Sequence, residues 1–410
     1  MSSMISVAEA IQIVREQVRP LESEAVDLAN ALGRILAEDV VADSDLPPFD
    51  RSQMDGYAVR AQEIKSATQD APARLRIVGE SAAGRGWHSE MGTGEAVRIM
   101  TGAPVPKGAD SVQQVELTRE HDSGGVVEIL QAVEFGRSIV TRGSEIKSGE
   151  TVLGAGERIN AAMIAVLASF GYAQVKVGKR PKVTVIATGS ELVAVDQKPG
   201  RDQIRDSNNY SIAAYATLAG AIVECLPLAG DDTELLKRQI ADAAERSDVV
   251  VTSGGVSVGV YDFTKAALKE LEAEVFFERV ALRPGKPTVF ARLPNGALAF
   301  GLPGNPVSVS VTFNLFARTA LLAMQGARAT TLKNEFAMLE HSVKGSVDRE
   351  SYLPARLKTD PAGHLMAEPL KWGGSSDFVA FARANGLIMA PAGTKILKIG
   401  STVRVLRLPN

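Results

Sequence analysis

The stretch Asp248–Ala273, DVVVTSGGVSVGVYDFTKAALKELEA, changes character three times within a few residues. Val249–Val251 is a short β-branched run, which is typical of a parallel strand buried on both faces. Gly254, Gly255 and Gly259 follow, and because glycine has no Cβ the backbone there can take positive φ and approach a ligand closely. The pattern predicts a strand that ends in a glycine loop.

A helix is expected after this loop. Asp262 is a candidate N-cap, and apolar residues recur behind it at helical spacing. A strand, a glycine loop and a helix N-terminus in this order make an anion site, because the first N–H groups of the helix are unpaired and carry partial positive charge. We therefore expect phosphate here, although a βα turn that binds nothing would have the same pattern.

Two rival motifs lead to other predictions. A P-loop needs a Gly-Lys-Ser/Thr ending, which is absent, and this disfavours an ordinary P-loop NTPase. Gly255–Gly259 matches the G-x-S-x-G pattern of hydrolases, with Ser257 as the nucleophile. Ser257 lies several residues past the valine run, whereas a hydrolase serine sits on the sharp turn itself. We interpret the match as accidental.

The region from Val183 to Gly326 alternates strand and helix patterns, which favours a three-layer α/β/α domain with a mostly parallel sheet. Asn295–Gly296 predicts a hairpin turn at one edge. In such a sheet the loops at the carboxyl ends of the strands share one crevice. That geometry should bring together Thr188–Glu191, Asp231, the Ser253–Asp262 loop and the Gly301–Pro306 loop.

The rest of the chain predicts a multidomain α/β plus β protein with β-rich accessory domains. The expected division is an elongated scaffold domain (1–50 and 142–180), a β-rich module (51–141), the α/β domain (181–327) and a C-terminal β-barrel-like domain (328–410). Ser6–Glu9 is a capping box that should open an N-terminal helix.

Composition excludes several classes of protein. The net charge of −3 and the scattered Lys and Arg residues favour neither nucleic acid nor a membrane surface as a partner. Cys225 is the only cysteine, so neither an intramolecular disulfide nor a thiolate metal cluster can form. We expect no apolar run of membrane-spanning length and no signal peptide, hence a cytoplasmic protein. A metal, if used, should be a hard cation held by carboxylates.

Six motifs occur in the order seen in molybdopterin molybdenumtransferases, the family that includes bacterial molybdenum-cofactor insertion enzymes and part of gephyrin. The chain resembles this family over nearly its whole length. The motifs are Met54–Val59, Thr101–Pro106, Ala187–Leu192, Ser253–Gly259, Arg283–Pro287 and Leu302–Pro306.

The resemblance implies the reaction. Adenylylated molybdopterin would bind to the α/β domain, molybdate would be inserted at its dithiolene sulfurs, and AMP would leave with help from Mg²⁺. It also implies a homodimer whose composite active site takes Asp55 and Thr101 from the partner subunit. A molybdopterin adenylyltransferase and molybdoenzymes are possible further partners. The alternatives are an adenylyltransferase acting on molybdopterin and ATP, or a non-catalytic dimeric scaffold.

Residue roles follow from the resemblance together with charge. A carboxylate about 4 Å from molybdate would be repelled by roughly 4 kcal/mol per unit-charge pair at an effective dielectric of 20, so carboxylates should hold the cation instead. The expected catalytic residues are Asp55, Thr101, Glu191 and Asp262, and the expected metal ligands are Glu191, Asp231 and Asp262. The expected substrate-binding residues are Gly254, Gly255, Ser257, Arg283, Lys286, Pro303, Asn305, Arg349 and Ser375.

Some positions depart from the family pattern. Arg283 stands where lysine is common, which keeps the charge but changes the donor geometry. Pro354 replaces an arginine of many relatives, and Ser376 with Phe378–Phe381 replaces a glycine-serine pattern. These departures concern how the C-terminal domain completes the site.

Overall fold

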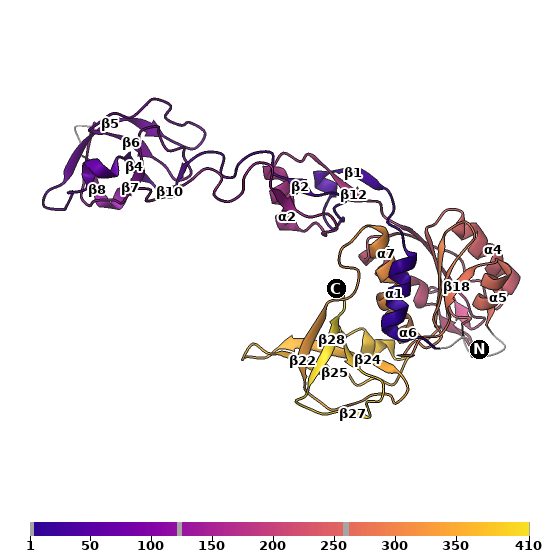
Figure 1. Cartoon of the computed structure of the whole chain (residues 1–410). Coiled ribbons are helices and arrows are strands. Elements are labelled where there is room, and N and C mark those ends of the chain that lie inside the picture. Colours follow the sequence, from indigo (N-terminus) through magenta and orange to yellow (C-terminus); the bar gives the residue numbers. More distant parts are fainter. Residues whose placement is uncertain (1–3, 121–124, 257–261, 410) are drawn as a thin grey trace. The chain divides into compact units, whose positions relative to one another are not determined.

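The computed structural model describes residues 4–120, 125–256 and 262–409 (Figure 1). Its internal contacts divide the chain into two compact units. The first comprises Met1–Glu38, Ala155–Ile164 and Gln174–Asn410, and the second comprises Asp39–Gly154 and Ala165–Ala173. The four-domain division expected from the sequence is finer than this and stays a prediction.

The first unit is built on a six-stranded sheet in the order β16-β13-β17-β21-β20-β18. Its parallel strands are β13 (Lys182–Ala187), β16 (Ile222–Cys225), β17 (Val249–Ser253) and β21 (Leu298–Leu302). The antiparallel additions at one edge are β20 (Val289–Arg292) and β18 (Glu274–Phe277). The mostly parallel sheet is therefore confirmed, as is the hairpin at Asn295–Gly296, which joins β20 to β21.

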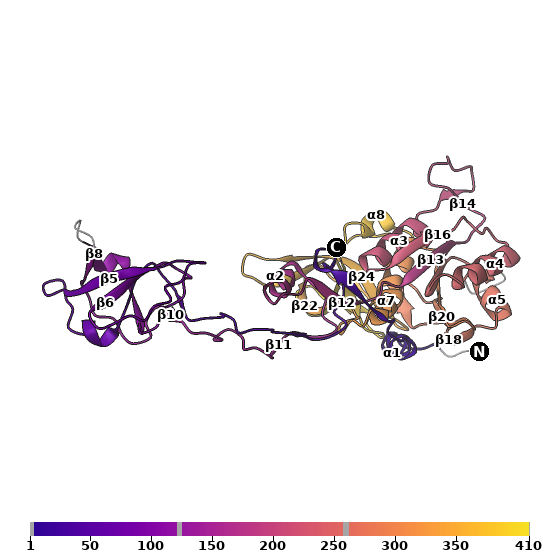
Figure 2. The ribbon, with the colours of Figure 1, turned by 90° about the horizontal axis from the view of Figure 1, so that it is seen from above.

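Helices cover both faces of this sheet (Figure 2). Val249 and Val251 pack against one face with α1 (Val7–Gln17), α3 (Asn208–Leu218), α6 (Pro306–Thr312) and α7 (Arg318–Met324). Val250 points to the other face, into a core shared with α4 (Thr233–Ala244) and α5 (Phe263–Glu270). A strand with both faces buried explains the unbroken valine run.

The helical stretch Pro306–Met324 corrects one expectation. It is long and apolar enough to cross a membrane, so the view that no run reaches that length is wrong. Its most apolar window is 89% buried inside the fold, as in the core helix of a globular domain. The π-helical turn Phe313–Ala317 lies between α6 and α7 and is buried as well.

The C-terminal region closes into a five-stranded barrel. The strands follow the order β24-β25-β22-β28-β26, and an additional pairing of β26 with β24 completes the ring. Their bounds are β22 (Asn334–Leu339), β24 (Glu350–Thr359), β25 (Leu365–Pro369), β26 (Gly386–Ala390) and β28 (Thr402–Arg407). The short helix α8 (Phe378–Phe381) follows β25. The predicted barrel-like domain is confirmed.

The second unit contains a six-stranded sheet in the order β7-β4-β6-β5-β9-β8. Its strands are β4 (Gly56–Val59), β5 (Ala73–Ser81), β6 (Glu95–Ile99), β7 (Ser111–Gln114), β8 (Thr118–Glu120) and β9 (Val126–Ile129). Gly56 is required in β4, because a Cβ there would lie 1.9 Å from the carbonyl oxygen of Gln113 on β7. This is the expected β-rich module.

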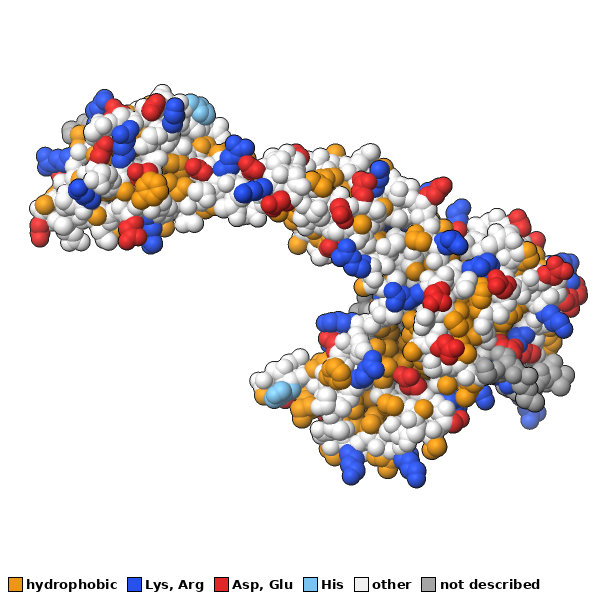
Figure 3. Space-filling model, in the orientation of Figure 1, with side chains coloured by type: hydrophobic (Ala, Val, Ile, Leu, Met, Phe, Trp, Pro, Cys, Tyr) orange, Lys and Arg blue, Asp and Glu red, His pale blue; other side chains and the backbone are white. Residues whose placement is uncertain are grey.

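Short pairs complete the elements. They are β1 (Ser23–Asp27) with β12 (Gln174–Gly178), β2 (Val40–Val41) with β11 (Thr151–Leu153), β3 (Arg51–Ser52) with β10 (Ile139–Val140), β14 (Leu192–Val193) with β15 (Ile204–Arg205), and β23 (Val343–Lys344) with β27 (Ile396–Leu397). Strand β19 (Leu282–Arg283) joins β24, and α2 is Ala161–Ser169. Lys and Arg are interspersed with Asp and Glu over the face shown in Figure 3.

Candidate functional site

The carboxyl ends of the parallel strands open onto a cavity of about 590 Å³, here called the glycine-loop cavity. It is lined by all the loops that the sheet topology was expected to gather, including Glu191, Asp231, Gly254 and Asn305. The expected crevice is therefore present in the described part of the chain. Ser257 and Gly259, which were also predicted to belong to this loop, lie outside the described residues.

The glycine loop has the predicted conformation but not all of the predicted N–H donors. Gly254 and Gly255 have φ of +94° and +63°. The Gly254 amide donates to the carbonyl of Leu302 at 3.0 Å, so it is not available to a phosphate. The Gly255 amide has no hydrogen-bond acceptor among the described residues, which leaves it able to bind an anion. Of these two glycine amides, only that of Gly255 is left for a phosphate.

Asp262 occupies the N-cap position of α5, yet its side chain makes no capping hydrogen bond. Its Oδ2 lies 2.7 Å from the Nζ of Lys265. Its Oδ1 is buried and has no hydrogen-bond partner in residues 4–120, 125–256 and 262–409. A buried carboxylate oxygen without a donor is suited to a cation or to a ligand hydrogen, so the capping interpretation does not account for this residue.

Asp231 precedes α4 but is not its cap. The cap of α4 is Asp232, whose Oδ1 accepts from the amide of Leu235 at 3.0 Å. Asp231 is exposed, and it lines the glycine-loop cavity together with the exposed Glu191. Within the described ranges no three His, Cys, Asp or Glu side chains gather into a ready-made metal cluster. Two carboxylates in one cavity still fit Mg²⁺, which is usually held by one or two carboxylates and substrate phosphates.

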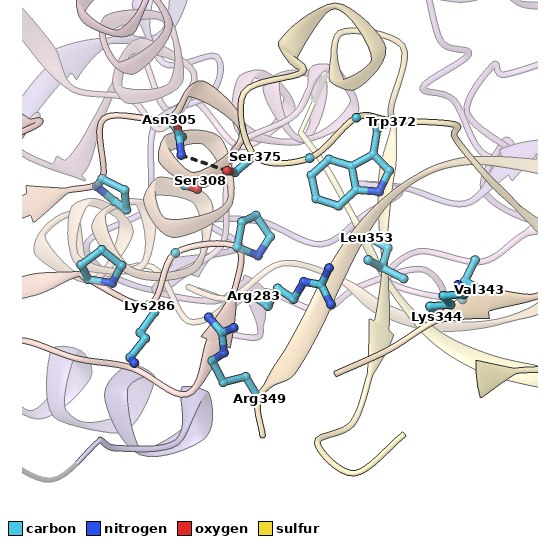
Figure 4. A pocket seen from close by; sticks show the side chains of 16 residues that line it. Arg283, Lys286, Asn305, Ser308, Val343, Lys344, Arg349, Leu353, Trp372 and Ser375 are labelled. Carbon is cyan, nitrogen blue, oxygen red and sulfur yellow. Dashed lines mark hydrogen bonds between the residues drawn. The ribbon is translucent and has the colours of Figure 1, made fainter. Parts of the chain in front are cut away.

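A second cavity, of about 680 Å³, is rich in cations and is called the cation cavity (Figure 4). It brings together the predicted residues Arg283, Lys286, Arg349 and Ser375. Figure 4 shows the three cationic side chains on one side and Ser375, hydrogen-bonded to Asn305, on the other. No Asp or Glu is among the described residues that line it. A wall with only positive charge is suited to an anion.

Two of the lining residues that sequence reasoning missed change the chemistry of this cavity. Lys344 on β23 adds a fourth cation, and Trp372 adds an aromatic wall. Arg349 is partly engaged, since its Nε donates to the Oδ2 of Asp348 at 3.2 Å. The pKa of Asp348 is lowered, first by the hydroxyl of Ser346 and then by Arg349. No local pattern marked these residues.

A third cavity, of about 790 Å³, lies between the β14–α3 segment and α8 and is called the α8 cavity. The loop Pro303–Pro306 contributes to all three cavities, and Asn305 lines each of them. Asn305 is at the N-cap position of α6 with Pro306 at the start of the helix, but its side chain makes no capping hydrogen bond. Its Nδ2 donates instead to the Oγ of Ser375 at 2.9 Å, which links the sheet to the chain segment before α8.

The two remaining predicted residues, Asp55 and Thr101, meet in the second unit. The Oδ1 of Asp55 accepts from the amide of Thr101 at 2.7 Å and from its hydroxyl at 2.8 Å. These two bonds, the backbone one first, lower the pKa of Asp55. Both residues are exposed, and the pairing is equally what turn chemistry would produce.

Comparisons with known proteins match nearly the whole chain. Three family models match in order: the MoeA N-terminal region (domain I and II) over residues 5–171, the probable molybdopterin binding domain over 184–323, and the MoeA C-terminal region (domain IV) over 337–408.

Relatives named molybdopterin molybdenumtransferase are similar over nearly their full length. The Staphylococcus epidermidis protein is 35% identical over 402 residues, covering 98% of this chain and 95% of that protein. The Bacillus subtilis protein is 36% identical over 413 residues, covering 98% and 94%. Two crystal structures of the molybdopterin biosynthesis MoeA protein of Pyrococcus horikoshii align with TM-scores of 0.81 and 0.86, at 33% and 27% identity, each covering 99% of this chain. The chain belongs to the molybdopterin molybdenumtransferase family.

Proposed function

We propose that this chain inserts molybdate into adenylylated molybdopterin, with release of AMP, to form molybdenum cofactor. The observation that carries the proposal is the separation of charge at the mouth of the sheet. Carboxylates line the glycine-loop cavity, while every charged side chain among the described residues that line the adjacent cation cavity is a cation. An oxyanion substrate could therefore bind in the cation cavity, and a phosphoanhydride with its metal ion could bind in the glycine-loop cavity. The loop Pro303–Pro306 borders both cavities.

Molybdate is assigned to the cation cavity. Each cation about 4 Å from the dianion would attract it by roughly 8 kcal/mol before desolvation, at an effective dielectric of 20. Arg283 and Arg349 offer planar donors that can bind two oxygens at once, whereas Lys286 acts as a point charge. The hydroxyl of Ser375 can still donate to an oxyanion, because it accepts the bond from Asn305.

The phosphates are assigned to the glycine-loop cavity, beside the Gly255 amide and the wall formed by Pro303. Asp231, Glu191 and the unpaired Oδ1 of Asp262 are the groups that would hold Mg²⁺. When bound, that ion would neutralise charge on the phosphoanhydride and assist departure of AMP. Asp55 and Thr101 are assigned to the composite site of a cytoplasmic homodimer, in which a partner subunit supplies them.

The test is AMP release from adenylylated molybdopterin by the full chain, with and without added molybdate. We expect release that requires molybdate and occurs without ATP consumption; ATP use would favour the adenylyltransferase. Asp262→Ala should abolish turnover while its circular dichroism stays unchanged. Asp242→Asn, an exposed carboxylate on α4, is the matched control and should retain full turnover. An equal rate of AMP release with and without molybdate would refute the proposal. Unchanged turnover in Asp262→Ala would show that Asp262 has no part in the reaction.

A further inference from the structure

A fourth cavity, of about 1020 Å³, lies at the amino ends of the parallel strands and is called the amino-end cavity. Lys182, the first residue of β13, lines it together with Asp248, which precedes β17, and Leu298, the first residue of β21. The glycine-loop cavity lies at the carboxyl ends of the same strands, so the two cavities are at opposite edges of the sheet. The amino-end cavity shares no lining residue with the other three cavities, and the proposed function makes no use of it.

Cations outnumber carboxylates among the described residues that line this cavity. The cations are Arg19, Lys179, Arg180, Lys182, Arg246 and Arg292, and the carboxylates are Glu22, Glu245 and Asp248. Six positive and three negative side chains give the lining a formal charge of +3. An excess of one sign in a cavity attracts ligands of the opposite sign.

Helix ends account for only part of this excess. Helices α1, α4 and α7 all end at the cavity, and the partial negative charge of their last carbonyl groups attracts cations. These carbonyls already have donors, which are the Arg292 guanidinium for Gln17 (2.8 Å), the Asn295 side-chain amide for Ala244 (2.9 Å) and the Leu21 backbone N–H for Met324 (2.7 Å). Arg246 serves the last turn of α4 in the same way, since it donates to the carbonyl of Asp242 at 2.7 Å. The other four cations have no such role.

Three of the six cations remain without a partner. Lys179 is paired with Glu22 at 2.8 Å, whereas the side chains of Arg19, Arg180 and Lys182 make no hydrogen bond or ion pair within residues 4–120, 125–256 and 262–409. All three are exposed. Glu245 is the one carboxylate of the lining whose side chain likewise has no partner in these ranges. Three unpaired cations against one unpaired carboxylate leave a net positive charge that is available to a ligand.

The backbone beneath two of these cations is fixed. The amide of Lys182 donates to the Oδ2 of Asp248 at 2.7 Å, and the carbonyl of Lys182 accepts from the amide of Asp248 at 2.9 Å. The carbonyl of Pro181, between Arg180 and Lys182, accepts from the amide of Ile222 at 2.9 Å. A ligand therefore has to order only side-chain rotamers and not the chain that carries them.

Apolar side chains lie beside the cations. Pro20 is exposed, Leu21 is half-buried, and both line the cavity next to Arg19. Apolar groups with a charged rim are the usual composition of a protein–protein interface. The volume of about 1020 Å³ is also at the upper limit of small-molecule sites, which span roughly 300–1,000 Å³, so a small oxyanion would fill little of it.

We propose that the amino-end cavity docks an acidic segment of a partner protein. Carboxylates of that segment contact Arg19, Arg180 and Lys182, and an apolar side chain of it covers Pro20 and Leu21. Charge complementarity identifies this occupant, since the unpaired groups of the cavity are mainly cations. The proposal goes beyond the proposed function and does not rest on it. Docking at the amino ends of the strands leaves the glycine-loop cavity open, so a docked partner does not block the substrate.

The experiment measures binding of a fluorescently labelled peptide to the full-length protein by anisotropy at low ionic strength. The probe is a peptide of glutamate residues interspersed with leucines, and the comparison peptide has lysine in place of glutamate. We expect the acidic peptide to bind and the lysine peptide not to bind. The affinity for the acidic peptide should fall as salt is added, because salt screens exposed charges.

Removing the unpaired cations should weaken this binding. An exposed ion pair is worth at most about 1 kcal/mol, which is about fivefold in affinity at 1.4 kcal/mol per decade. The triple variant Arg19→Ala, Arg180→Ala and Lys182→Ala should therefore bind about 10- to 100-fold more weakly if the three pairs are additive. The control triple variant is Lys269→Ala, Lys395→Ala and Lys398→Ala, which removes three exposed lysines that line none of the four cavities and should bind like wild type.

Absence of acidic-peptide binding overturns the proposal. An equal loss in both triple variants also overturns it, because that would report attraction by the overall charge of the protein. Inorganic pyrophosphate is titrated in parallel, and binding of pyrophosphate without binding of the peptide overturns the proposal by assigning the cavity to a small anion. Both triple variants should keep the wild-type circular dichroism and rate of AMP release. Peptide binding by a protein that releases no AMP would refute the proposed function alone.

Discussion

Replacing Gly254 with alanine should damage the glycine loop through two separable effects. The first is conformational, because Gly254 has φ of +94°, which a residue with a Cβ adopts at a cost of about 1–2 kcal/mol. The second is steric, because the new Cβ would lie 2.5 Å from the carbonyl oxygen and 2.8 Å from the Oγ1 of Thr188. Forcing atoms into such a packed site costs about 1–3 kcal/mol.

Thr188 cannot move aside easily. Its amide donates to the carbonyl of Ser253 at 2.9 Å, and Gly254 itself is bonded to Leu302 at 3.0 Å. The two effects together predict a loss of about 2–5 kcal/mol in the free energy of unfolding of the first unit.

Gly296→Ala is the matched control. Its φ is +93°, but nothing lies within 4 Å of the position where a Cβ would stand. It should therefore lose only the conformational part, about 1–2 kcal/mol. Hydrogen exchange of the β17 amides at increasing urea concentration measures the local stability of both variants. The rate of AMP release measures their activity. If Gly254→Ala and Gly296→Ala are equally mild in both assays, the close approach of the loop to Thr188 is refuted.

Three further predictions concern the site groups. Arg349→Ala should raise the molybdate concentration for half-maximal turnover about 10- to 100-fold, because a hydrogen bond to a charged group is worth about 1.5–3 kcal/mol, and an unchanged value would remove Arg349 from the anion site. Lys265→Met should lower the Mg²⁺ concentration needed for half-maximal turnover, since the ammonium 2.7 Å from Asp262 competes with the ion; a higher requirement would contradict this. Asp55→Asn should destabilise the protein at neutral pH. The folded pKa of Asp55 is lowered, so its contribution is present above the ordinary aspartate pKa and is lost as pH falls through the folded value. The difference between wild type and variant in urea unfolding should therefore vanish in acid, and a difference that persists there would contradict the Thr101 bonds as its cause.

The parts of the fold set by local patterns could be predicted from the sequence. Val249–Val251 indicated a doubly buried strand, and the order of strands and helices was enough to place Glu191 and Asp231 in one crevice. The glycines indicated the loop because a backbone position with positive φ favours glycine over other residues.

The parts that depend on distant contacts could not be predicted. Lys344 on β23 and Trp372 after β25 enter the cation cavity from the C-terminal region, and no nearby motif indicates that they do. The use of the Gly254 amide by Leu302 depends on the pairing of β17 with β21. Asp232, not Asp231, caps α4, and this depends on the residue at which the helix begins. A sequence pattern does not define the first residue of a helix to within one position.

The loop Pro303–Pro306 forms part of the wall of all three cavities. Any displacement of this loop by a ligand in one cavity changes the space in the other two. Linkage then requires reciprocity: if molybdate alters the affinity for the nucleotide by some factor, the nucleotide must alter the affinity for molybdate by the same factor. The order in which the substrates bind would then be set by the four residues Pro303–Pro306. Lengthening this loop should remove the effect of one ligand on the affinity for the other before it abolishes the binding of either.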